Sequence, residues 1–172
     1  MARNLLVFLW LISIGPRADA ADSTLIFKKK NMFFVEAGGK GPYYSLNYGR
    51  IFKQGTKLIY SWRAGFSLLA HDLSVPLAIN AFTVGLKHHF ECSIGITPYL
   101  KGYKTFLHSP DLSDKQIYIT PSIGYRFQRA NSDFFLSAGI DPLIFMDPPS
   151  DRFWNFKPEF IPSAHIALGF LF

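Results

Sequence analysis

The 172-residue chain is poor in cysteine and in charge. Cys92 is its only cysteine, so no intrachain disulfide can form. Charged residues make up 17% of the chain, against about 25% in average proteins. Beyond residue 20 no apolar run is long enough for a membrane-spanning helix, so any later membrane span must be built from strands. No linker, repeat or shift in composition marks a second domain.

The N-terminus has the layout of an export signal. Arg3 is followed by an apolar run over Leu5–Ile14, a Gly-Pro break and the small-residue pattern Ala18-Asp19-Ala20. The run is too short to span a membrane and suits the apolar region of a secretory signal. We therefore expect a cleavable signal peptide over residues 1–20 and one domain over residues 21–172.

Aromatic residues are abundant, and they alternate with small or polar residues. The chain has 18 Phe and 8 Tyr, and aromatics make up 17% of it. Near the C-terminus every second residue is apolar: Phe160, Pro162, Ala164, Ile166, Leu168, Phe170 and Phe172. A period of two indicates a strand. An apolar outer face with small polar groups inside is typical of a transmembrane β-barrel, although a soluble β-sandwich can show the same alternation.

Eight segments of the chain show this strand-like character. Most are near the length of about 9–11 residues that a tilted membrane strand requires. The fold class predicted is all-β: an eight-stranded antiparallel up-and-down transmembrane β-barrel that follows a signal peptide. The segments are residues 31–39, 42–52, 57–70, 74–84, 88–101, 115–128, 133–146 and 158–172.

The connections between these segments differ in length in a regular way. Short polar turns follow the even-numbered segments, at residues 53–56, 84–87 and 129–132. Two of the connections after odd-numbered segments are longer, at residues 102–114 and 147–157. Bacterial outer-membrane barrels have short periplasmic turns and longer external loops. The pattern predicts the bacterial outer membrane as the location, with both termini periplasmic.

Five prolines inside the proposed strands are the main objection to this assignment. Proline cannot donate a hydrogen bond to a β-ladder and belongs at edges or bulges. We therefore interpret some of these positions as bulges in the barrel wall. They are Pro76, Pro98, Pro121, Pro142 and Pro162.

If the apolar faces point outward, charged side chains gather in the lumen. An eight-stranded barrel is just wide enough for side chains to fill it, and ions buried there must pair. We predict a structural ion-pair network from Glu36, Arg63, Glu91, Arg126 and Asp141, with His89 and His165 nearby. A gated narrow conduit and a catalytic cluster are the alternatives.

The catalytic alternative has one concrete form. Ser163 and His165 lie two apart on one predicted strand, and Glu159 shares their parity. A serine, a histidine and an acid are the elements of an acyl-transfer site. Residues two apart on a strand are separated by about 6.5 Å, too far for a direct hydrogen bond. The three are therefore weak candidates.

No metal or phosphate site is indicated. His88 and His89 are adjacent, so on a strand they face opposite ways, and the remaining histidines are scattered. The glycines of residues 38–41 suit a tight hairpin turn. The aromatic stretch over residues 153–156 suits an interfacial girdle or, alternatively, contact with a ligand. We expect no cofactor, no metal and no nucleic-acid partner.

Three stretches resemble the small Gram-negative outer-membrane β-barrel proteins of undefined function. They are residues 34–39 with 44–48, residues 119–125, and the tail that ends in Phe172. The resemblance implies insertion by the outer-membrane assembly machinery, with Phe170 and Phe172 as its recognition signal. It also implies outer-membrane lipids and lipopolysaccharide as partners, and it leaves the oligomeric state open.

Three functions are compatible with this chain. We expect first a structural or surface-interaction barrel with a side-chain-filled lumen. The alternatives are a narrow channel for small or apolar solutes and a lipid A-modifying acyl hydrolase. Because a fold does not determine a function, the choice between them needs the geometry of the lumen.

Overall fold

The computed structural model describes residues 27–69, 71–103, 111–129, 131–152 and 154–172. The expected signal peptide, residues 1–20, lies outside the described residues. Within the described ranges, no helix has the length and apolarity needed to cross a membrane. The elements are β1 Asn31–Gly38, β2 Tyr44–Gln54, β3 Leu58–Leu69, β4 Asp72–Ser74, β5 Leu77–Thr83, β6 His88–Leu100, η1 Leu112–Asp114, β7 Lys115–Gln128, β8 Phe134–Ile140, β9 Leu143–Asp147, β10 Glu159–Ile161 and β11 Ala164–Leu171.

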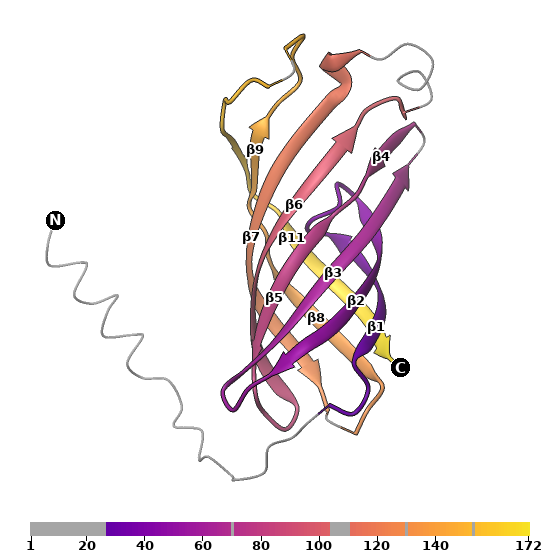
Figure 1. The fold of residues 1–172 in the computed structure, drawn as a ribbon, viewed down its shortest axis with the longest axis vertical. Helices are drawn as coiled ribbons and strands as arrows, with labels where there is room; N and C mark the ends of the chain where they lie inside the picture. The colour runs from indigo at the N-terminus through magenta and orange to yellow at the C-terminus, as the bar shows by residue number, and fades with distance from the viewer. Residues whose placement is uncertain (1–26, 70, 104–110, 130, 153) are drawn as a thin grey trace, which may run out of the picture.

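The strands close into a barrel (Figure 1). β1 pairs with β2 along one edge and with β11 along the other, and every pairing in the sheet is antiparallel. Three traverses of the wall are interrupted, as β4 with β5, β8 with β9, and β10 with β11, so the segments make eight strands around the barrel. The predicted eight-stranded up-and-down barrel is confirmed, and closure leaves the ring without a continuous free edge.

The prolines act differently from the expectation of bulges. Pro76, Pro142 and Pro162 each lie at one of the three interruptions, whereas Pro98 and Pro121 lie within continuous β6 and β7. The register shifts occur elsewhere, in β2 and near the start of β7. Because proline has no N–H to donate, the ladder ends locally at the three interruptions instead of bulging. Carbonyl groups still bridge the wall there: that of Pro76 accepts a hydrogen bond of 2.8 Å.

The wall is apolar outside and polar inside. On β5, Leu77 and Ile79 are 42% and 55% exposed, while the intervening Ala78 and Asn80 are 8% and 6% exposed. The same alternation runs along β11, where Ile166 faces out. A water-soluble sheet buries its apolar face, so this barrel has the inverse pattern, which suits a hydrocarbon surrounding.

The two ends of the barrel differ. The β2–β3, β5–β6 and β7–β8 turns lie together at the lower end in Figure 1, where β11 also finishes; we call this the turn end. At the opposite end β7 rises higher than the other strands in the view. An apolar cluster fills part of the interior, and it consists of Phe27, Met32, Phe34, Ile51, Ile59, Phe82, Phe135, Ala167 and Leu171.

Candidate functional site

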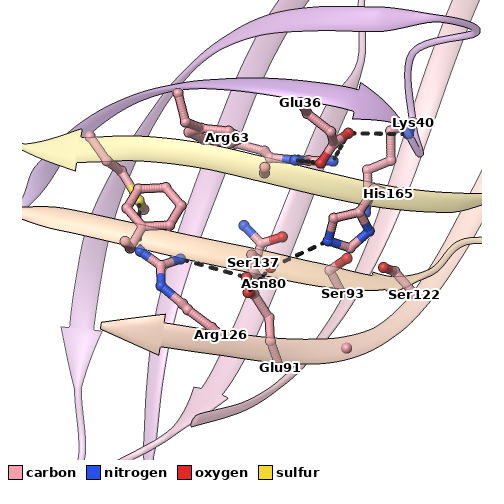
Figure 2. Close-up of a pocket in the computed structure, with 15 residues that line it drawn as sticks. Glu36, Lys40, Arg63, Asn80, Glu91, Ser93, Ser122, Arg126, Ser137 and His165 are labelled. Atoms are coloured by element: carbon pink, nitrogen blue, oxygen red, sulfur yellow. Dashed lines mark hydrogen bonds and ion pairs between the residues drawn. The ribbon is translucent and has the colours of Figure 1, made fainter. Parts of the chain in front are cut away.

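A polar cavity lies in the lumen, and Figure 2 shows the side chains that enclose it. Its volume is about 20 Å³, which is room for roughly one water molecule. Side chains from most of the strands converge on it. Its polar lining consists of Glu36, Lys40, Arg63, Asn80, Glu91, Ser93, Ser122, Arg126, Ser137 and His165.

Glu36 on β1 and Arg63 on β3 form a bidentate salt bridge. Two guanidinium nitrogens of Arg63 lie 2.5 and 3.0 Å from the two carboxylate oxygens of Glu36. The side chains are 1% and 5% exposed. Bidentate hydrogen bonds between a guanidinium and a carboxylate are among the strongest side-chain hydrogen bonds. Each ion offsets the desolvation of the other, so neither can be removed alone without leaving a buried charge.

Lys40 closes the lumen from the end opposite the turns. It belongs to the β1–β2 connection, which folds inward so that the Lys40 side chain is 2% exposed. Its ammonium nitrogen lies 3.0 Å from a carboxylate oxygen of Asp141. The hydroxyls of Thr97 and Tyr118 donate to its carbonyl oxygen at 3.0 and 3.1 Å. The turn is therefore held inside the barrel by its side chain and by its backbone.

Asp141 lies at the interruption between β8 and β9. Its N–H donates to the carbonyl of Ser163 at 2.8 Å, so the two neighbouring interruptions are bonded to each other. The carboxylate is fully buried and contacts Lys40, Ser122 and the imidazole of His165. The break at Pro142 thus places the Asp141 carboxylate where it can accept hydrogen bonds from the β1–β2 turn, from β7 and from β11.

His165 makes contacts in the order of an acyl-transfer triad. Its Nδ1 faces the Asp141 carboxylate, and its Nε2 lies 3.3 Å from the hydroxyl oxygen of Ser137. The Ser137 hydroxyl, however, donates its only proton to Glu91 at 3.1 Å. The adjacent cavity holds about one water, so no acyl chain can reach the serine. The arrangement can orient charges but has no space for a lipid substrate.

The acid and serine of this cluster are not those suggested by strand parity. Within the described residues, His165 bonds to Ser137 and Asp141, which belong to the neighbouring traverse of the wall. Ser163 is half-buried, and the exposed Glu159 lies 3.7 Å from Lys157. Side chains two apart on a strand stay separated, whereas residues of adjacent strands approach to hydrogen-bonding distance.

Arg126 lies between the polar cavity and the apolar cluster. Its guanidinium is 3.9 Å from the ring centre of Phe135 and 4.7 Å from that of Phe82. Its Nε donates to the side chain of Gln128 at 2.7 Å, and Glu91 is 3.7 Å away. Two aromatic faces and one carboxylate thus stabilise a cation that is 2% exposed.

The remaining predicted positions have structural surroundings. His89 is buried, and its ring nitrogens face the main-chain carbonyls of Thr83 and Gln128 at 2.6 and 2.9 Å. Among the described residues, no group of three or more His, Cys, Asp or Glu side chains is placed to hold a metal ion. Phe170 and Phe172 are exposed on the outer wall near the turn end. Their role as an assembly signal stays a prediction.

Three members of the network were not predicted from the sequence: Lys40, Ser122 and Ser137. Ser122 shares strand parity with Arg126, and Ser137 shares it with Asp141 in the next predicted segment, so both could have been found from the alternation alone. For Lys40 the available signal was a single lysine between glycines. Gly39 has a φ of +69°, a conformation that glycine adopts without strain and that turns the chain inward. The aromatic stretch over residues 153–156 includes Phe153, which lies outside the described residues; Trp154 and Phe156 are exposed.

Comparison with solved structures finds a β-barrel domain that aligns with this chain. The crystal structure of the N-terminal β-barrel domain of Pseudomonas aeruginosa OprF aligns with a TM-score of 0.49 and 16% sequence identity. The alignment covers 84% of this chain and 100% of that domain. No protein-family model and no curated protein matches the chain. The barrel itself is established by the pairing of β1 with β11.

Proposed function

We propose that the protein is an integral outer-membrane β-barrel with a sealed lumen and a structural or surface-interaction role. The observation that carries the proposal is the inverse distribution of side chains. Three carboxylates and three basic side chains meet inside the barrel, while large apolar side chains cover its outer wall. Exposing such an apolar wall to water would favour aggregation, whereas a hydrocarbon surrounding accommodates it.

The lumen is closed in successive layers. The apolar cluster occupies one part, Arg126 stacks on its edge, the Glu36–Arg63 pair crosses the middle, and the inward-folded Lys40 turn covers the remainder. A continuous water path would need these contacts to separate. We therefore favour the sealed barrel over the narrow channel.

Membrane insertion is tested by fractionation and by gel mobility. A closed barrel in the outer membrane is expected to sediment with that membrane and to migrate faster before boiling than after it. Recovery in the soluble periplasmic fraction would contradict the proposal.

Sealing is tested separately in planar lipid bilayers. The wild-type protein is expected to give no single-channel steps at moderate voltage. The matched variant Lys40→Ala removes the ammonium group that binds Asp141. It is expected to give small conductance steps, which also show that the protein has inserted into the bilayer. Steps of equal size from wild type and variant would instead support the channel.

A further inference from the structure

The turn end carries a dense set of exposed basic side chains. They come from the segment before β1, from the outer face of β2, and from the three turns. Among the described residues of these segments Asp133 is the one carboxylate side chain, and it lies 2.6 Å from Lys29. We call this set the basic rim; it consists of Lys28, Lys29, Lys30, Arg50, Lys53, Lys57, Lys87 and Arg129.

The backbone beneath the basic rim is firmly bonded. The main-chain carbonyls of Lys30, Lys57 and Lys87 accept hydrogen bonds of 2.8, 2.9 and 3.0 Å from backbone N–H groups of neighbouring segments. The charged side chains therefore project from a well-bonded backbone around one end of the barrel. Like charges held this close to one another repel, so an external anion is the natural partner.

A belt of exposed aromatic side chains lies on the outer wall next to the rim. Lys53 and Arg129 reach over the rings of Tyr60 and Phe127, at 5.9 and 5.8 Å from the ring centres. Tyrosine and tryptophan belts occupy the level of lipid head groups in membrane barrels. The belt includes Phe33, Tyr48, Phe52, Trp62, Phe90, Tyr125, Phe134, Phe170 and Phe172.

The opposite end has no comparable excess of positive charge among its described residues. Its acidic side chains are Asp72, Asp111, Asp114, Asp147, Asp151 and Glu159, and its basic ones are Lys101, Lys115, Arg152 and Lys157. Among the described residues, the excess of positive charge therefore lies at the turn end, next to the aromatic belt.

We propose that the basic rim binds the phosphate groups of anionic phospholipids in the leaflet around the turn end. This inference rests on the membrane insertion proposed above. Lysine and arginine beside an anionic lipid surface are attracted to it within a Debye length. A rim at head-group depth can bind phosphates directly, through charge-assisted hydrogen bonds.

The test compares two triple variants that lose the same charge at opposite ends. K53Q/K57Q/K87Q removes three rim charges, and K101Q/R152Q/K157Q is the matched control. Each protein is purified in a neutral detergent and titrated with phosphatidylglycerol or phosphatidylcholine. Native mass spectrometry then counts the lipids retained. Folding into vesicles of phosphatidylcholine, with or without phosphatidylglycerol, is followed by heat-modifiable mobility.

Wild type and control are expected to prefer phosphatidylglycerol. The rim variant is expected to lose about a hundredfold of that preference, since each of the three removed basic groups contributes about fivefold. The rim inference alone is overturned if both variants lose the preference for phosphatidylglycerol equally. It is also overturned if the wild type folds into neutral vesicles but shows no preference for phosphatidylglycerol. Failure of the wild type to insert into any vesicle overturns the membrane proposal as well.

Discussion

Removing Arg63 tests whether the lumen network stabilises the barrel. The substitution Arg63→Ala deletes both contacts to Glu36, at 2.5 and 3.0 Å, and leaves a carboxylate that is 1% exposed. Breaking one partner of a buried pair costs about 3–5 kcal/mol, because the remaining ion is left without compensation. The Lys40 N–H still donates to Glu36 at 3.2 Å, so we expect the lower half of this range.

The partner variants separate this effect from lost packing. Glu36→Gln and the double variant Glu36→Gln/Arg63→Ala complete a double-mutant cycle. The double variant should be destabilised by less than the sum of the single changes, since it carries no unpaired buried ion at this site.

The assay is reversible urea unfolding in lipid vesicles, followed by the fraction of the fast-migrating folded band. A loss below about 1 kcal/mol for Arg63→Ala, which is the range of exposed ion pairs, would refute the reasoning. Strict additivity in the cycle would refute it as well, because it would mean that the two ions do not interact.

Three further changes probe the same lumen. Gly39→Ala places a methyl group 2.8 Å from a Glu36 oxygen and from the His165 Cβ, and the left-handed backbone adds about 1–2 kcal/mol of strain to the folded state. We expect a lower urea midpoint of unfolding, and an unchanged midpoint would contradict the inward turn. Phe135→Ala should cost about 3–5 kcal/mol by cavity formation, seen in the same unfolding assay, whereas Phe134→Ala, on the exposed face, should cost far less. Lys40→Gln should keep the barrel folded by gel mobility but raise solute leakage in vesicle-swelling assays; leakage equal to wild type would show that the Lys40 charge does not seal the lumen.

Strand positions were largely predictable from the sequence. Alternation of large apolar and small residues over β6 and β7 indicates their extent closely, because side chains leave a strand on opposite faces. The interruptions at Pro76, Pro142 and Pro162 were harder to place. Proline shows that a ladder bond is missing, but the neighbouring strand decides whether the wall bulges or breaks.

Pairing inside the lumen was not predictable to the same extent. Parity assigns Glu36 and Arg63 to the interior, and the register of β1, β2 and β3 then brings them together. The partners of His165 depend on the register of β8 and β11. That register brings Ser137, distant in sequence, to 3.3 Å and leaves Ser163 half-buried.

The sequence by itself determined the class of the fold and which residues face the outside and the inside of the wall. Local alternation encodes both, since each residue's face depends only on its parity along a strand. Only the tertiary structure decided how the lumen is closed. The inward turn of Lys40 and its bond to Asp141 join residues far apart in the chain. Their meeting depends on barrel closure, which no local pattern encodes.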